Sequence, residues 1–272
     1  GERHDHSREH VVGSFRRQGL SGGEWELLPG GPALQSPALI AHDGKLYRIG
    51  GLSARNAENE TPDLHSVASV DCFDPSSRTW SQVVPMPSAR SAHDAVVVDD
   101  SIFVVGGWRH HGDEGEGDWH DSLLQLNLSA TRPKWKTVTQ TPFERRALSV
   151  AALGQDLYVI GGMTRDSDFS REVDVYNIEA ESWSKGPQLP ESEYNGFGSS
   201  AFTIDGRLYA SSMSDQLLVL SRDGNQWHQA AFLDVQRFFH RLIPGSQGTA
   251  LLVAGANDEN GHLASISCVD LD

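Results

Sequence analysis

A short apolar run that ends in two small residues recurs along the chain. Three copies end in paired glycines, KLYRIGG (45–51), SIFVVGG (101–107) and DLYVIGG (156–162), and two degenerate copies follow, RLYASS (207–212) and ALLVAG (250–255). Successive copies lie 43 to 56 residues apart. Because a period in this range is typical of repeat architectures, the pattern predicts five copies of one structural unit.

Each copy has the same surroundings. An alternating run such as AHDAVVV (92–98) precedes it, with tight-turn residues such as Asp43-Gly44 or Asp205-Gly206 between the two runs. A third run follows, for example EVDVYN (172–177), and a fourth carries one tryptophan, which is Trp80, Trp135, Trp183 or Trp227. Four strands in constant order predict an all-β protein, a β-propeller of four-stranded blades.

The repeats predict the organisation of the chain. We expect a flexible polar leader at 1–20 and one domain at 21–272, with blades at about 36–83, 90–138, 145–187, 196–229 and 238–272. The last blade stops after its third strand, and the missing tryptophan strand occurs at 24–29, around Trp25. Pairing of 24–29 into the last blade would remove an open sheet edge and close the propeller. Five blades are expected, or six if residues 7–20 hold a degenerate strand.

The repeat resembles the kelch family. The shared features are the double glycine, the aromatic residue before Asp or Asn in the third strand (Phe73-Asp74, Tyr176-Asn177) and the spaced tryptophan. The resemblance covers about residues 24–272, and it is weaker in the last two blades, where Ser211-Ser212 and Ala254-Gly255 replace the glycine pair. The chain looks more like bacterial stand-alone kelch proteins than like adaptors with extra helical domains. This resemblance implies a propeller with one face that binds acidic peptide segments or small ligands.

Strand order also predicts which face carries function. The loops between second and third strands are long and dissimilar at 52–65, 108–121 and 163–171, whereas the turns on the opposite face are short. Long variable loops on a rigid scaffold are common sites of function. We therefore expect a binding site on the face that carries these loops.

Arginines gather on that predicted face. Arg90 and Arg145 hold equivalent positions, each 16 residues before its glycine pair, while Arg237 and Arg241 flank the corresponding position of the fifth blade. The long loops add three more, which are Arg55, Arg109 and Arg165. Guanidinium groups that surround one mouth of a central channel would favour carboxylate or phosphate partners. The alternative is that each arginine pairs with an acidic residue of a neighbouring blade.

Aromatic residues and one amide complete the candidate binding site. Trp108 and Trp119 lie outside the blade pattern and suit contact with a ligand or partner. The alternative is that they cap the edge of the second blade. Three further aromatic residues and an amide, Tyr194, Asn195, Phe238 and Phe239, fall in the loops between blades and would line the same mouth.

The loop WRHHGDEGEGDWHD (108–121) also contains weak candidates for metal ligands, which are His110, His111, His120 and Asp121. Their spacing matches no metal-binding motif, so we expect neither a metal nor another cofactor.

Charge and motifs narrow the function classes. The formal net charge of −15 disfavours nucleic acid and acidic membranes as partners. No nucleophile elbow, phosphate loop or clustered Cys/His motif occurs in the sequence. We expect a monomeric, non-catalytic binding module that engages a protein partner or an anionic small ligand through its arginine-rich loop face. The alternative is an enzyme similar to a sugar-acid mutarotase or epimerase that uses the same channel mouth.

Overall fold

The computed structural model describes residues 6–20, 22–112, 117–191 and 195–271, and the regular structure of this part of the chain is entirely β. The chain divides into two compact units, Gly1–Gln140 and Thr141–Asp272.

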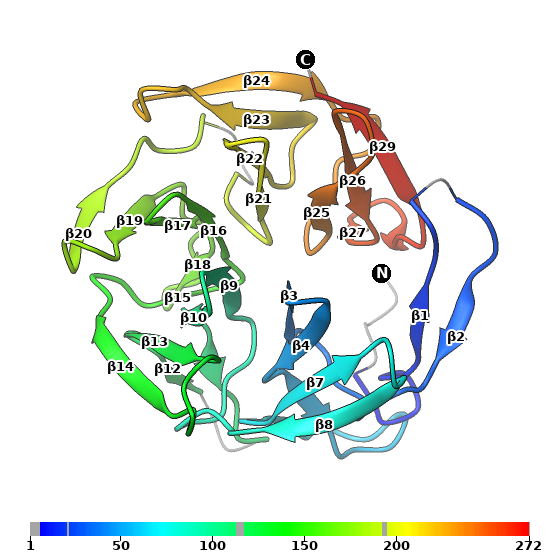
Figure 1. Ribbon diagram of the computed structural model, residues 1–272. Coiled ribbons are helices and arrows are strands. Elements are labelled where there is room, and N and C mark those ends of the chain that lie inside the picture. The colour runs from blue at the N-terminus through cyan, green and yellow to red at the C-terminus, as the bar shows by residue number, and fades with distance from the viewer. Residues whose placement is uncertain (1–5, 21, 113–116, 192–194, 272) are drawn as a thin grey trace. The chain divides into compact units, whose positions relative to one another are not determined.

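The first unit contains two four-stranded antiparallel sheets (Figure 1). The first blade consists of β3 (Ala38–His42), β4 (Lys45–Ile49), β7 (Val70–Asp74) and β8 (Thr79–Val83). The second consists of β9 (Asp94–Val98), β10 (Ser101–Val105), β13 (Ser122–Asn127) and β14 (Trp135–Gln140). Shorter pairs accompany them, namely β1 (Phe15–Arg17) with β2 (Glu26–Leu28), β5 (Leu52–Ala54) with β6 (Leu64–Ser66), and β11 (Trp108–Arg109) with β12 (Asp118–Trp119).

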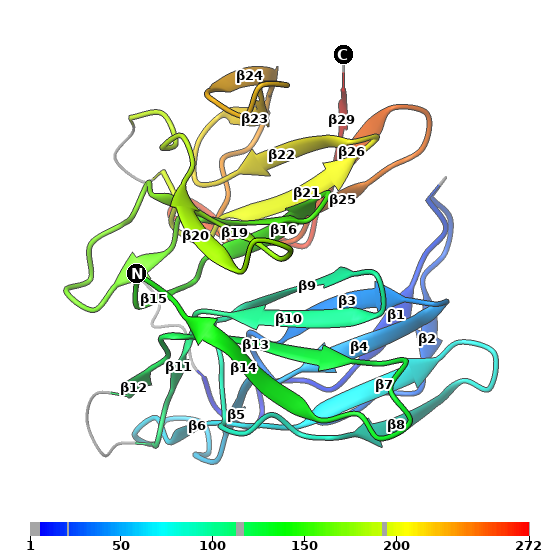
Figure 2. The ribbon, with the colours of Figure 1, turned by 60° about the vertical axis from the view of Figure 1, so that its left-hand side comes forward.

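The second unit contains three blades (Figure 2). The third blade is β16 (Ser149–Leu153), β17 (Asp156–Ile160), β19 (Val173–Asn177) and β20 (Ser182–Lys185), and the fourth is β21 (Ser200–Ile204), β22 (Arg207–Ser211), β23 (Gln216–Leu220) and β24 (Trp227–Phe232). The fifth is β25 (Arg241–Pro244), β26 (Thr249–Val253) and β29 (Ile266–Asp270). Two small pairs are added, β15 (Arg145–Arg146) with β18 (Met163–Thr164) and β27 (Ala256–Asn257) with β28 (Gly261–His262).

The predicted four-stranded blade is confirmed in the first four repeats. Each sheet follows chain order, as in β3-β4-β7-β8, because each strand turns back on the one before it. Asp43 and Gly44 in the first turn have φ values of 46° and 70°, and Asp205 and Gly206 in the fourth have 49° and 71°. These left-handed conformations match the twist of the strands they connect.

The sheets pack face to face through their apolar side chains. In the first unit, Tyr47, Ile49 and Val70 of the first blade share one buried cluster with Ile102 and Leu126 of the second. Adjacent blades of the second unit are joined by equivalent clusters. Because side chains alternate between the two faces of a strand, a central strand contributes to the packing on both sides of its sheet.

A tryptophan hydrogen bond links successive repeats. The indole Nε1 of Trp80 donates to the Pro29 carbonyl at 2.8 Å, and that of Trp135 donates to the Val84 carbonyl at 2.9 Å. In the second unit, Trp227 donates to Pro187 at 2.8 Å. Each acceptor lies four residues after the tryptophan of the preceding repeat. Pro29 lies four residues after Trp25, so Trp25 holds the same position as the tryptophans of the other repeats.

The described residues 6–20 contact the first blade and include the strand β1, whereas a flexible leader was expected at 1–20. Strand β1 pairs with β2 in the register Phe15↔Leu28. The Phe15 ring packs 5.0 Å from Phe73 and 5.3 Å from Trp80, measured between centroids. A strand therefore occurs within 7–20, but it pairs with β2 and does not add a sixth four-stranded blade.

The fifth sheet has three strands in the described part of the chain. Residues 24–29 supply the strand β2, as expected, and the partner that the structure gives it is β1. The pairing of 24–29 with the last blade would join residues of the two units, and it stays a prediction.

We predict that Trp135→Phe lowers the free energy of unfolding by about 1–3 kcal/mol, because the Val84 carbonyl loses its donor while most of the ring packing is kept. Urea denaturation followed by circular dichroism would measure this. Lys136→Ala, at an exposed position of the same strand, is the control and should change stability by less than about 0.5 kcal/mol. Equal stability of Trp135→Phe and the wild type would contradict the proposed role of the indole N–H.

Candidate functional site

Three of the predicted binding arginines lie inside the blades. The exposed fractions of Arg90, Arg145 and Arg237 are 1%, 2% and 1%. Each donates from Nη1 to the carbonyl of the first small residue of its pair, which is Gly106 at 3.0 Å, Gly161 at 2.7 Å or Ala254 at 3.0 Å.

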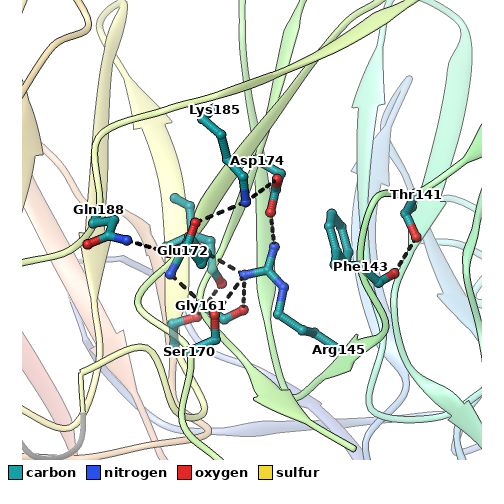
Figure 3. Close-up of polar contacts among 11 residues, drawn as sticks. Thr141, Phe143, Arg145, Gly161, Ser170, Glu172, Asp174, Lys185 and Gln188 are labelled. Atoms are coloured by element: carbon teal, nitrogen blue, oxygen red, sulfur yellow. Dashed lines mark hydrogen bonds and ion pairs between the residues drawn. The ribbon is translucent and has the colours of Figure 1, made fainter.

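The same guanidinium groups also reach the start of the third strand. Arg90 Nη2 donates to Ser122 Oγ at 2.9 Å, and Arg237 Nη2 donates to Ser267 Oγ at 2.8 Å. Arg145 donates to the Glu172 carbonyl at 2.9 Å and forms an ion pair with the buried Asp174 (Figure 3). One side chain thus connects the end of the second strand, where the sheet hydrogen bonds stop, with the beginning of the third.

The surroundings of Arg145 show how the buried charge is compensated. Lys185 Nζ lies 3.0 Å from the other carboxylate oxygen of Asp174 and 2.9 Å from Glu172 (Figure 3). The Phe143 ring lies with its centroid 4.1 Å from the Arg145 guanidinium carbon. Burial lowers the pKa of Arg145, and it lowers the pKa of Arg90 to about 9.

These contacts correct the predicted ligand site. A buried guanidinium already bonded to carbonyls of its own blade is not presented to an anion, so Arg90, Arg145 and Arg237 serve the scaffold. The alternative, in which each arginine pairs with an acidic residue of a neighbouring blade, is also wrong for these three arginines. Their hydrogen-bond and ion-pair partners belong to the same blade as the arginine. Sequence spacing located the equivalent positions correctly but did not show which way the side chains turn.

The other predicted arginines are exposed. Arg55 and Arg109 lie in the loops of the first unit, and Arg165 and Arg241 lie in the second. Arg165 forms an exposed ion pair with Glu144 at 2.9 Å. Asn195, by contrast, is buried, with Nδ2 donating to the Pro190 carbonyl and Oδ1 accepting from Ser212. Tyr194 lies outside the described residues.

The long loops of the first two blades join into one small sheet. Strands β5 and β6 pair as a hairpin, as do β11 and β12, and a bridge between His65 and His111 connects the hairpins. Backbone bonds from Ser66 to His110 and from Gly112 to Leu64 fix this junction. The two loops therefore form a single hairpin platform, defined here as residues 52–66 and 108–112 with 117–119.

The predicted tryptophans meet on this hairpin platform. Trp108 and Trp119 are cross-strand partners whose ring centroids lie 6.0 Å apart, and both rings are half-buried. Trp108 also makes an edge contact with His110 at 5.1 Å. The rings stabilise the hairpin and leave part of their surface accessible.

The histidines of this region bond to protein groups. His110 Nδ1 lies 2.7 Å from the Leu64 carbonyl, His111 pairs with Asp118 at 2.8 Å, and His120 Nε2 lies 2.9 Å from the Ala89 carbonyl. Among the described residues no group of three or more His, Cys, Asp or Glu side chains is placed to hold a metal ion. Asp121 is exposed, and residues 113–116 of the loop lie outside the described residues.

An aromatic cluster in the second unit contains two residues that the sequence predicted for the binding site and two that it did not. Phe197 stacks on Phe169 at 4.5 Å, and its centroid lies 5.3 Å from Phe238 and 5.1 Å from Phe239. Phe238 and Phe239 make an edge contact at 5.0 Å. We call these four rings the phenylalanine cluster, of which Phe238 and Phe239 were predicted to line a binding site and Phe169 and Phe197 were not. The rings come from three different loops, and Phe239 and Phe169 are 55% and 36% exposed.

The backbone at Phe239 shows why this cluster is unusual. Phe239 has a φ of 56° and lies two residues before the first strand of its blade. The same position and a similar φ occur at Ser36, Ala92, Ala147 and Gly198, with φ values between 50° and 54°. Large side chains seldom adopt this left-handed conformation. Small residues fill the position in four blades, and the fifth places an exposed ring there, a difference that alignment of the repeats would have revealed.

His240 follows Phe239 and is buried. Its Nε2 lies 2.6 Å from Ser211 Oγ, so it joins the fourth and fifth blades. Burial, assisted by the positive charges of Arg237 and Arg241, lowers the pKa of His240 to about 3.

Comparison with known proteins identifies the class. A family model described as "KLHDC2/KLHL20/DRC7 Kelch-repeats domain" matches residues 36–232. A solved structure titled "Structure of YjhT" superimposes with a TM-score of 0.75 at 14% identity, covering 92% of this chain and 85% of that one. The protein belongs to the kelch-repeat family, and its fold is a β-propeller with five blades.

Curated relatives agree with this assignment. The human "Kelch repeat and BTB domain-containing protein 12" is 25% identical over 76% of this chain, and the mouse "Kelch-like protein 36" is 33% identical over 44% of it. These matches span only 36% and 20% of the relatives' own lengths. Kelch-repeat propeller domains generally mediate protein interactions, which is consistent with non-catalytic binding. In the described residues no helix has the length and apolar character needed to cross a membrane.

We predict that Arg145→Met lowers the free energy of unfolding by about 3–5 kcal/mol, because it leaves Asp174 buried without its guanidinium partner. Arg165→Met removes one member of the exposed pair with Glu144, and it should cost at most about 1 kcal/mol. Chemical denaturation of both variants measures the difference. Similar small losses would show that the buried arginine does not serve the scaffold.

Acid should destabilise the fold through His240. Its folded-state pKa of about 3 lies below the ordinary value of 6.5, so the unfolded chain binds a proton that the folded chain does not. Stability is therefore lost as the pH falls below about 6.5, by roughly 1–2 kcal/mol between pH 7 and pH 5. Denaturation across this range should show a smaller loss for His240→Asn and an unchanged loss for the exposed His228→Asn. The same slope in all three proteins would contradict this role for His240.

Proposed function

We propose that this protein is a non-catalytic binding module that holds a segment of a partner protein against the loops of its second unit. The observation that carries the proposal is the phenylalanine cluster, in which four rings from three loops pack together and two remain substantially exposed. Aromatic side chains are enriched in the centres of protein interfaces because they bury a large area with few rotatable bonds. The cluster would accept an apolar side chain of the partner.

Charge supports a particular kind of segment. Arg165 shares its loop with Phe169, and Arg241 lies two residues after Phe239. Both side chains of the ion pair between Arg165 and Glu144 are exposed. A carboxylate of the partner would therefore replace Glu144 beside Arg165 at little cost in free energy. The proposed ligand is therefore an apolar residue with acidic residues beside it. Arg55, Arg109, Trp108 and Trp119 lie in the first unit, and their role in binding a partner stays a prediction.

Binding fits the structure better than the mutarotase-like alternative. That alternative uses an arginine beside an acid–base pair at the channel mouth. The three equivalent arginines, Arg90, Arg145 and Arg237, are instead engaged with the backbone of their own blades.

We predict that Phe239→Ala weakens binding of selected peptides at least about tenfold, the size expected for an aromatic anchor at the centre of an interface. The peptides are selected from a random phage-displayed library on the wild-type protein, and their affinities are measured by fluorescence polarisation. Phe232→Ala is a matched control, because Phe232 is 70% exposed on the outer strand β24 and lies outside the cluster.

The acidic part of the ligand is tested separately. A double variant, Arg165→Ala with Arg241→Ala, should weaken peptides that contain Asp or Glu and leave neutral selected peptides unchanged, more clearly at low salt. Peptides that bind Phe239→Ala as tightly as the wild type would overturn the proposed site, and selection of basic peptides alone would overturn the proposed charge preference.

A further inference from the structure

A cavity in the first unit lies where the N-terminal segment meets the first blade. It has a volume of about 320 Å³ and is lined by Arg8 and Val11 from the N-terminal segment, by Ser53 and Ala54 of β5, and by neighbouring residues Pro32, Ala33, Leu34, Val67 and Ser69. The cavity is separate from the phenylalanine cluster, and none of its residues was a candidate in the sequence analysis.

The N-terminal segment is held firmly against the blade. The backbone N–H of Arg8 donates to the Asn56 carbonyl at 3.0 Å, and the Glu9 carboxylate accepts from the Glu58 N–H at 3.0 Å. Ser7 is fully buried, and its hydroxyl lies 2.8 Å from His10 Nδ1. His6 Nδ1 lies 2.9 Å from Gln35 Oε1. These contacts on both sides of Arg8 fix its backbone at the rim of the cavity.

The first-blade loop that accepts the Arg8 N–H is itself held by an internal hydrogen bond. Asn56 is 5% exposed, and its Oδ1 accepts from the Asp63 N–H at 3.1 Å, which braces the loop that receives Arg8. A site held in place on both sides loses little conformational freedom when it binds, so it favours affinity for small ligands.

The chemistry of the lining indicates the ligand. Among the described residues, Arg8 forms no ion pair within 4.0 Å, and the carboxylate of its neighbour Glu9 accepts from the Glu58 N–H. Ser53 and Ser69 add two hydroxyl groups, and Val11, Pro32, Leu34 and Val67 make most of the remaining wall apolar. Apolar walls with a few converging polar groups are typical of sites for small molecules.

We propose that this cavity binds a small organic acid. The carboxylate would face the Arg8 guanidinium, whose planar pair of N–H donors matches two carboxylate oxygens, and the body of the acid would lie against the apolar wall. A single guanidinium with two hydroxyls suits one delocalised negative charge better than the higher charge of a phosphate. Occupancy would also tie the N-terminal segment more strongly to the first blade.

The test is titration of the full chain with sodium benzoate, sodium butyrate and N-acetylglycine, followed by NMR chemical shifts. Butyramide has nearly the shape of butyrate without its charge, and inorganic phosphate has charge without an apolar body. We expect binding of at least one acid, and Arg8→Gln should weaken it about tenfold to a hundredfold, the effect of removing a charge-assisted hydrogen bond. Arg16→Ala is the matched control, because Arg16 is exposed in the same N-terminal segment and does not line the cavity.

A second variant tests the cavity without changing any residue of the N-terminal segment. Ser69→Val narrows the cavity from the blade side, leaves Arg8 in place, and should also weaken the acid severalfold. The proposal is overturned if no acid binds, if Arg8→Gln and Arg16→Ala bind it equally, or if butyramide or phosphate binds as tightly as the acids. Failure of this test leaves the peptide experiment on Phe239 untouched, since the two sites share no residue.

Discussion

The bond from a buried guanidinium to the carbonyl that ends the second strand is the interaction on which the second, third and fifth blades depend. At that carbonyl the chain leaves the sheet through residues of positive φ, such as Gly106 and Gly161, so the regular ladder no longer supplies a donor. An unpaired carbonyl in a blade interior would cost free energy. Arg90, Arg145 and Arg237 supply the donor and also reach the third strand, so one side chain holds both ends of a long loop.

The cost of burying these charges explains their fixed geometry. A guanidinium removed from water needs bonded donors, which the carbonyls, the serine hydroxyls and Asp174 provide to its terminal nitrogens. Once bonded in this way the arginine cannot be shared with a ligand. The loops that it anchors are then free to differ between blades, and they carry Phe169 of the phenylalanine cluster and the second-blade hairpin of the hairpin platform.

The two proposed sites use different parts of this scaffold. The phenylalanine cluster lies in the second unit and depends on a left-handed position that four other repeats fill with small residues or glycine. The cavity beside Arg8 lies in the first unit and depends on a segment that precedes the first blade. A repeat protein can carry both because each blade is stabilised by its own bonds and by its neighbours' packing, so a loop changes without disturbing distant blades.

The sequence by itself determined the repeated blade, its strand order and the positions that recur. Strand alternation, turn residues and tryptophan spacing are local signals, and the runs that they marked contain β4, β10, β17 and β22. Tertiary structure decided where the side chains of the arginines that precede the first strand of a blade point. The equivalent spacing of Arg90 and Arg145 fits a ligand site and a structural bond equally well, because only packing shows which acceptors lie within reach. It also decided that Phe169, Phe197, Phe238 and Phe239 meet, since their loops are far apart along the chain, and that residues 6–11 fold against the first blade.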